Sequence, residues 1–143
     1  MTSIAKRPIP STDMDIDRNG CVWKGHVKVP TTILRSQYGV KQLAIEMHGE
    51  PVAVWFLLSV IWYDQCMILP RDGNALNWSA DNTIVLRGEW VCHIVQAAEV
   101  LLIWVTYCEG VPCWQLGEKT GLHQYYEEQF REVIKAILIA GIR

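Results

Sequence analysis

Residues 90–107, WVCHIVQAAEVLLIWVTY, decide which of two folds this chain adopts. Their many β-branched and aromatic residues, and the hairpin signals on either side, favour two strands at 90–96 and 99–107. The stretch is too long for one ordinary strand, however, and residues 96–99 (QAAE) contain no good turn residue. The alternative is one buried helix, which would make the fold richer in helices and its sheet smaller. The apolar side of that helix would consist of Val91, Ile94, Val95, Ala98, Leu101, Leu102 and Val105.

Shorter runs of strand-forming residues lie on both sides of this stretch. Glycine at the first central position of a two-residue turn is typical of type II′ hairpins, which predicts hairpins at residues 48–51 (HGEP) and 87–90 (RGEW). A further turn is predicted at residues 108–110 (CEG). We predict a short helix at 31–38, capped by Thr31 and ended by Gly39. The other predicted strands are 21–29, 40–48, 52–62, 82–87 and 112–116.

The end of the chain has the pattern of an amphipathic helix. Apolar residues recur three and four positions apart from Leu122, and charged residues fall between them. Thr120 is a suitable N-cap and Gly141 a suitable stop, so we predict a helix of about five turns. Its apolar side consists of Leu122, Tyr126, Phe130, Val133, Ile134, Ile137 and Leu138.

Together these elements predict an α+β fold, in which a curved, mainly antiparallel sheet of hairpins packs against the long amphipathic C-terminal helix. This order of elements is similar to that of helix-grip domains of the START and Bet v 1 kind, which enclose an apolar cavity between sheet and helix. The resemblance rests on element order alone and on no motif. Residues 1–19, rich in proline and aspartate, are predicted to be a flexible N-terminal tail, and residues 20–143 a single α+β domain.

Composition and charge exclude several classes of protein. The chain has 143 residues, of which 50% are hydrophobic and 20% charged, as in an ordinary globular domain. Its net charge is −2, and its basic residues are scattered along the sequence, so we expect no nucleic-acid partner. The first twenty residues contain no apolar leader, and polar residues interrupt the longest apolar run. With five cysteines, an odd number, we predict a soluble cytoplasmic protein with no membrane partner.

Tryptophan is the one unusual component, with seven residues in the chain. Most of them lie in the charge-poor central segment and are expected to face a core, a cavity or a partner. Trp78 differs because it lies in a long polar loop, residues 70–82, and is either packed on the core or presented to a ligand. The candidate ligand-binding residues are Trp55, Trp62, Tyr63, Trp78, Trp90 and Trp104.

Candidates for acid–base chemistry are few. Glu99 is the only formal charge between Glu89 and Glu109, and a carboxylate among apolar residues is exposed, paired or buried with a raised pKa. His93 and Asp64 are the other candidates, Asp64 following an apolar run as either a turn residue or a carboxylate at a pocket rim. The sequence contains no phosphate-binding loop and no nucleophile elbow.

Metal ligation has equally little support. Cys108 and Cys113 are close enough for half of a zinc site, and His123 is a further possible ligand, but no second close pair of ligands accompanies them. We therefore expect neither a metal ion nor another cofactor.

Three hypotheses for the function remain. The first is a small binding protein with a Trp-rich apolar cavity or groove for a partly apolar or aromatic small molecule. The second is a protein-interaction module or homodimer that uses exposed aromatic anchors. The third is a small enzyme with a carboxylate and a histidine as its acid–base pair in the cavity.

Overall fold

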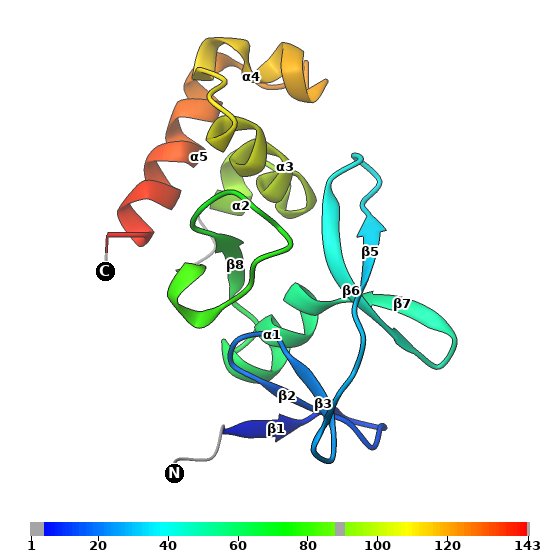
Figure 1. Ribbon diagram of the computed structural model, residues 1–143. Helices are drawn as coiled ribbons and strands as arrows, with labels where there is room; N and C mark the ends of the chain where they lie inside the picture. Colours follow the sequence, from blue (N-terminus) through cyan, green and yellow to red (C-terminus); the bar gives the residue numbers. More distant parts are fainter. Residues whose placement is uncertain (1–4, 88–90, 143) are drawn as a thin grey trace.

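The structure is a computed structural model that describes residues 5–87 and 91–142. It confirms a mixed α+β fold in which all strand pairs are antiparallel. The described strands form three separate sheets of four, three and two strands, so a single curved sheet and the likeness to helix-grip domains are not confirmed. Figure 1 shows the two larger sheets at one end and most helices at the other.

The first sheet is built from the N-terminal segment. Its strands are β1 (Lys6–Pro8), β2 (Asp15–Asp17), β3 (Val22–Lys24) and β4 (Val27–Lys28), paired in that order. The sequence predicts a flexible tail up to residue 19, but the structure places β1 and β2 in this sheet. The physical reason is burial, because Ile9 and Ile16 are 2% and 0% exposed and add apolar contacts to the core.

The second sheet contains β5 (Thr32–Arg35), β6 (Lys41–Met47) and β7 (Glu50–Ala53). The strand predicted at 40–48 is confirmed by β6, whereas the helix predicted at 31–38 is wrong, because β5 pairs along β6 instead. A hairpin between β6 and β7 is also confirmed, but its turn lies one residue earlier than predicted, at 47–50. Its turn is of type I′ and not II′, since the central residues His48 and Gly49 have φ values of 53° and 82°.

Helix α1 (Val54–Trp62) replaces most of the strand predicted at 52–62, so that prediction is wrong. Its sequence, VWFLLSVIW, is apolar on every side, and a short apolar run of this kind does not distinguish a strand from a buried helix. The inward side has helical spacing, because Val54, Leu57 and Leu58 are buried.

The strands predicted within residues 90–107 are wrong, and the stretch is helical as in the alternative, but it forms two helices and not one. Helix α2 (Val91–Ile94) is followed by α3 (Ala97–Cys108), with Val100, Ile103 and Trp104 buried at helical spacing. The hairpin predicted at 87–90 falls partly outside the described residues, as does Trp90. The strand predicted at 112–116 is likewise replaced by helix α4 (Cys113–Thr120).

The remaining elements agree better with the sequence. Strands β8 (Met67–Pro70) and β9 (Thr83–Leu86) form the two-stranded sheet, which confirms the strand predicted at 82–87; the short 3-10 helix η1 (Ala80–Asn82) precedes β9. Helix α5 (Glu127–Ala140) confirms the C-terminal helix but begins later than predicted. Its N-cap is Tyr126, whose backbone N–H donates to the Gln129 side chain at 2.7 Å, while the Thr120 hydroxyl bonds the Leu116 carbonyl within α4.

Two hydrophobic cores hold these elements together. One joins α3, α4 and α5 to β8 and β9, and the other joins the N-terminal sheets to α1. Val40, beside the β5–β6 loop, and Leu101, on α3, pack against both cores. The two cores therefore meet where this loop approaches α3. Within the described residues, none of the helices has the length and apolar character needed to cross a membrane.

Candidate functional site

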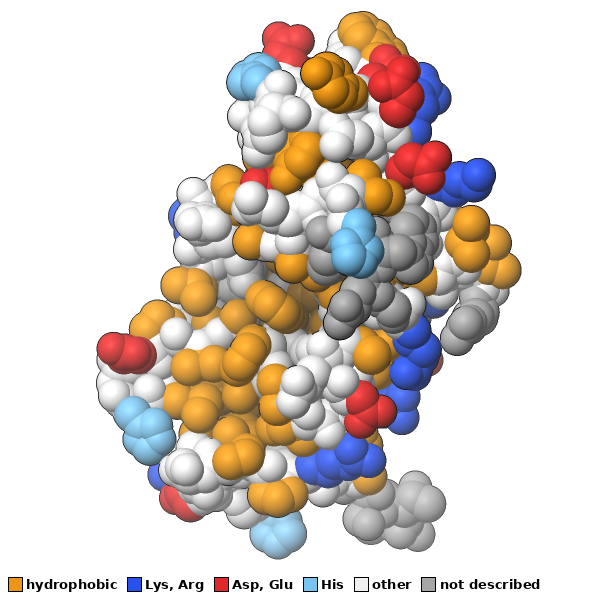
Figure 2. Space-filling model, turned by 180° about the vertical axis from the view of Figure 1, so that it is seen from behind, with side chains coloured by type: hydrophobic (Ala, Val, Ile, Leu, Met, Phe, Trp, Pro, Cys, Tyr) orange, Lys and Arg blue, Asp and Glu red, His pale blue; other side chains and the backbone are white. Residues whose placement is uncertain are grey.

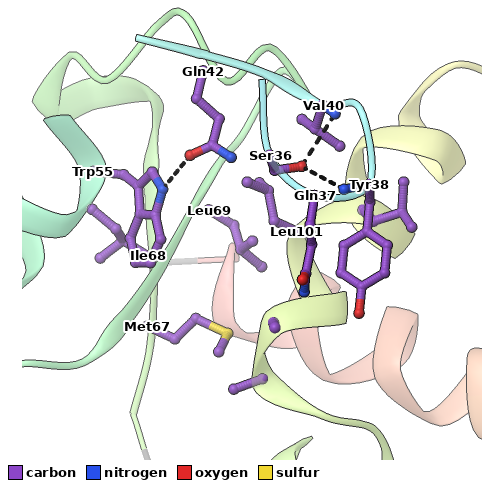
Figure 3. Close-up of a pocket in the computed structure, with 13 residues that line it drawn as sticks. Ser36, Gln37, Tyr38, Val40, Gln42, Trp55, Met67, Ile68, Leu69 and Leu101 are labelled. Carbon is purple, nitrogen blue, oxygen red and sulfur yellow. Dashed lines mark hydrogen bonds between the residues drawn. The ribbon is translucent and has the colours of Figure 1, made fainter. Parts of the chain in front are cut away.

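A pocket of about 400 Å³ lies where the two cores meet. The β5–β6 loop forms one wall, Trp55 of α1 and strand β8 form another, and the first turns of α3 close it (Figure 3). The side chains around it are mainly apolar. The described residues that line it are Ser36, Gln37, Tyr38, Val40, Gln42, Trp55, Met67, Ile68, Leu69, Ala97, Ala98, Leu101 and Leu102.

The loop that forms the rim is held by a serine side chain. The Ser36 hydroxyl accepts hydrogen bonds from the backbone N–H groups of Tyr38 and Val40, both at 3.2 Å, and the Ser36 N–H donates to the Val40 carbonyl at 2.9 Å. Gly39 has a φ of 81°, a conformation that favours glycine. These bonds fix the loop on the side of the pocket opposite Trp55.

One hydrogen bond crosses the polar side of the pocket. The Trp55 indole N–H donates to Oε1 of Gln42 at 2.6 Å, which joins α1 to β6 (Figure 3). Gln42 is only 6% exposed and lies on the same face of β6 as the buried Ala44. None of the described lining residues carries a charge, so the pocket offers no ion pair to a ligand.

Of the aromatic residues predicted to bind a ligand, Trp55 alone lines this pocket within the described part of the chain. Trp78 and Trp104 are 2% and 4% exposed, and their indole N–H groups donate to the carbonyls of Ala75 and Pro70. Tyr63 is buried in the N-terminal core. Trp62 donates to the Ile16 carbonyl at 3.0 Å. These indoles are core side chains whose polar atom has a backbone partner, as buried tryptophans require.

Arginine side chains cover Trp62 from outside. The guanidinium of Arg7 lies 4.0 Å from the centre of its ring, and that of Arg18 lies 5.9 Å away. Arg7 also donates to the Ile61 carbonyl at the end of α1. Cation–π contacts and a cation at a helix C-terminus are both stabilising, so these contacts attach the first sheet to α1.

The three candidate acid–base residues occupy different settings. Asp64 is an exposed residue of the turn after α1, with a φ of 52°. His93 is exposed on α2, whereas Glu99 is 3% exposed in the first turn of α3. No hydrogen bond joins any two of them in residues 5–87 and 91–142. None of the three lines the pocket.

Glu99 belongs to a small polar network beside the pocket. Its Oε1 accepts a long hydrogen bond of 3.4 Å from Gln124, and its Oε2 is buried without a partner in the described part of the chain. Burial of the Tyr125 phenol, together with the Glu99 carboxylate nearby, raises the pKa of Tyr125. The Tyr125 hydroxyl also accepts the Gln96 N–H at 3.1 Å. This network attaches the loop before α5 to the start of α3.

The candidate metal ligands do not form a cluster. Cys108 and His123 are exposed and Cys113 is half-buried, and no group of three or more metal-ligating residues was found among the described ones. Cys108 is exposed as a residue, but its sulfur lies beside Gly73, and this partial desolvation, with Asp72 and Glu109 nearby, raises the pKa of the thiol to about 11. Burial also raises the pKa of the Cys113 thiol.

The exposed aromatic residues that an interaction module needs are spread over the fold. Phe56 is 52% exposed on α1, Trp114 is 64% exposed on α4, and Tyr126 is 75% exposed at the start of α5. Phe56 and the 41% exposed Val60 leave the outer side of α1 apolar. Figure 2 shows a broad apolar area in the lower half of the molecule seen from behind.

Most of the pocket could not be found from the sequence. Gln42, Tyr38, Met67 and Leu101 come from separate elements, and the sequence contains no motif that links them. Gln42 had one usable signal, because it lies two residues from the apolar Val40 and Ala44 and so shares their face of the predicted strand. Comparisons with protein families, curated proteins and solved structures found no match to this chain.

Proposed function

We propose that the protein binds a small, neutral and mainly apolar molecule in the pocket between its two cores. The observation that carries this proposal is a pocket of about 400 Å³ with apolar walls and few polar groups, none charged among the described lining residues. Ligand sites typically occupy such volumes, are lined by apolar side chains with a few polar groups, and occur between packed units. The ligand is bound and released without chemical change.

The size of the pocket sets the affinity to expect. An aromatic group as large as a tryptophan side chain buries about 150–250 Å². At about 25 cal/mol per Å², this burial contributes about 4–6 kcal/mol. Association also costs translational and rotational freedom, so apolar burial alone gives dissociation constants no tighter than tens of micromolar. A natural ligand that also satisfies the polar side of the pocket should bind more tightly.

The proposal is tested with the neutral fluorescent probe N-phenyl-1-naphthylamine, titrated with the full-length protein. We expect saturable enhancement with a single site. Ala98→Trp fills the pocket from α3 and should abolish the enhancement. Leu138→Trp is the matched control, because it adds the same indole at a 47% exposed position of α5, away from the pocket, and should bind the probe normally.

A probe could also adsorb to the outer side of α1. Val60→Gln removes a 41% exposed apolar side chain from that surface and should leave the titration unchanged. Probe binding that survives Ala98→Trp but is lost in Val60→Gln would place the ligand on the surface of α1 and overturn the proposal. No saturable binding by the unmodified protein would overturn it as well.

A further inference from the structure

The hydrogen bond between Trp55 and Gln42 fixes which way the Gln42 amide faces. An indole N–H is only a donor, so the atom 2.6 Å from it must be the amide oxygen and not the nitrogen. The Nε2 group of Gln42 therefore lies on the other side of the amide. Figure 3 shows it turned away from Trp55, toward the space between Leu69 and Val40.

That Nε2 group is a donor without a partner. No hydrogen bond from it is formed within the described residues, and it is not among their fully enclosed unpaired atoms, so it borders the open space of the pocket. The residue as a whole is 6% exposed, which leaves little access to bulk water. An apolar ligand that covers this donor without bonding it incurs the cost of its lost hydration.

The other polar groups of the pocket lie at its rim. The Ser36 hydroxyl oxygen accepts two backbone N–H groups, which leaves its own O–H as the one remaining donor there, and the Gln37 amide belongs to an exposed residue that stays in contact with water. The Tyr38 phenol extends away from Gln42 in Figure 3. With no charged side chain among the described lining residues, an anionic or cationic ligand would lose its hydration without gaining a counter-charge.

We propose that Gln42 is the specificity-determining residue of the pocket and selects neutral apolar ligands that carry a hydrogen-bond acceptor, such as a ketone, ester or amide carbonyl. This inference rests on the proposed function, since it names the class of ligand for the same pocket. Trp55 acts as a positioning residue, because its indole N–H holds the Gln42 amide with the donor toward the ligand.

The test compares two probes of similar shape, 2-acetonaphthone with a carbonyl and 2-isopropylnaphthalene without one, by displacement of N-phenyl-1-naphthylamine. We expect the unmodified protein to bind the ketone on the order of tenfold more tightly, because only the ketone bonds the Gln42 donor. The anion 2-naphthoate should not compete.

Gln42→Glu is the decisive variant. Its ionised carboxylate retains an acceptor for the Trp55 N–H but replaces the Nε2 donor by a second oxygen, whereas the protonated form keeps an O–H donor, so the comparison is made in a pH series that reaches the ionised form. The preference for the ketone should disappear, and 2-naphthylmethanol, which carries a donor, should now bind more tightly than the ketone. A merely structural role of Gln42 would weaken all probes alike. Gln42→Met is similar in size and gives the same comparison if Gln42→Glu does not fold, with equal binding of ketone and hydrocarbon expected.

The two proposals fail in different ways. Equal affinities of the two probes for the unmodified protein, or an unchanged ketone preference in Gln42→Glu and Gln42→Met, would refute the role of Gln42 and leave the proposed function intact. Absence of binding by every neutral probe would refute the proposed function, and the role of Gln42 with it.

Discussion

Replacing Trp78 tests whether this side chain is part of the packed core or contacts a ligand. The side chain is 2% exposed in the core formed by the N-terminal sheets and α1. Its indole N–H donates to the Ala75 carbonyl at 2.8 Å, and the same carbonyl accepts the Leu43 N–H of strand β6 at 3.3 Å. Trp78 thus anchors the loop between β8 and β9 to the second sheet.

The loss of unfolding free energy expected for each Trp78 variant follows from these contacts. Truncation of a buried tryptophan to alanine costs about 3–5 kcal/mol of the free energy of unfolding, from lost burial and the cavity left behind. Trp78→Phe retains most of the apolar volume but loses one hydrogen bond, worth about 0.5–1.5 kcal/mol. Because the Ala75 carbonyl keeps its bond from Leu43, it is not left unpaired, and we expect a total cost of about 1–3 kcal/mol for Trp78→Phe.

Urea denaturation followed by far-ultraviolet circular dichroism measures both variants. If Trp78→Ala is too unstable to purify, which total stabilities of about 5–15 kcal/mol allow, Trp78→Phe still gives a value. Affinity for N-phenyl-1-naphthylamine should be unchanged in folded Trp78→Phe, because Trp78 does not line the pocket. A loss of probe binding with less than about 0.5 kcal/mol of destabilisation would refute the packed-core explanation.

Gly20→Ala should be more destabilising than Gly25→Ala by about 1–3 kcal/mol in urea denaturation. Both glycines have left-handed φ values, +82° and +64°, so the backbone strain is similar in the two variants. Only a Cβ at Gly20 meets side chains, the nearest at 3.1 Å. Burial acts to raise the pKa of Asp72, but hydrogen bonds from Asn74, Asn82 and Asn77 outweigh it and lower that pKa. At pH values above the unfolded pKa of about 3.9, the Asp72 carboxylate therefore stabilises the fold, and this contribution is lost as the pH falls through the lower pKa of the folded state. Thermal melts of the unmodified protein and Asp72→Asn over a series of pH values measure the loss. Cys108, with its pKa of about 11, should react slowly with iodoacetamide at pH 8 despite its exposure, and faster in Asp72→Asn.

Each of these has a result that contradicts it. Equal losses in the two glycine variants would show that the space around Gly20 is not tightly packed. A difference between unmodified protein and Asp72→Asn that does not change below pH 4 would show that the Asp72 carboxylate contributes nothing as a charge. Alkylation of Cys108 at the rate of a free cysteine would show that its surroundings do not raise the pKa of its thiol.

The sequence predicted elements well where a local signal marks them. Helix α5 was found because charged residues alternate with Phe130, Val133 and Ile137 at helical spacing, and β6 because a run of strand-forming residues ends at a glycine turn. Helices α1 and α3 were mistaken for strands because both are apolar on several sides. In α3, Val100, Ile103 and Trp104 are buried and Leu101 is half-buried, so no polar side reveals the helical period.

Of the described residues that line the pocket, the sequence named Trp55 alone. An apolar space beside a tryptophan was expected, and Trp55 lines the pocket. The other described tryptophans named as ligand residues, Trp62, Trp78 and Trp104, bond backbone carbonyls instead. Gln42 was not found, because its role depends on a donor, Trp55, that lies in a different element.

The sequence by itself determined a mixed α+β chain with an amphipathic C-terminal helix, a high tryptophan content and no recognisable catalytic motif, because these are local properties of composition and spacing. Only the tertiary structure decided that residues 91–94 and 97–108 are helical and that the buried indoles are packed and bonded. It also decided that two cores leave a pocket between them, near Val40 and Leu101. The physical reason is that a pocket is the space left by elements distant in the sequence, and no one segment encodes its shape or the direction of its donors.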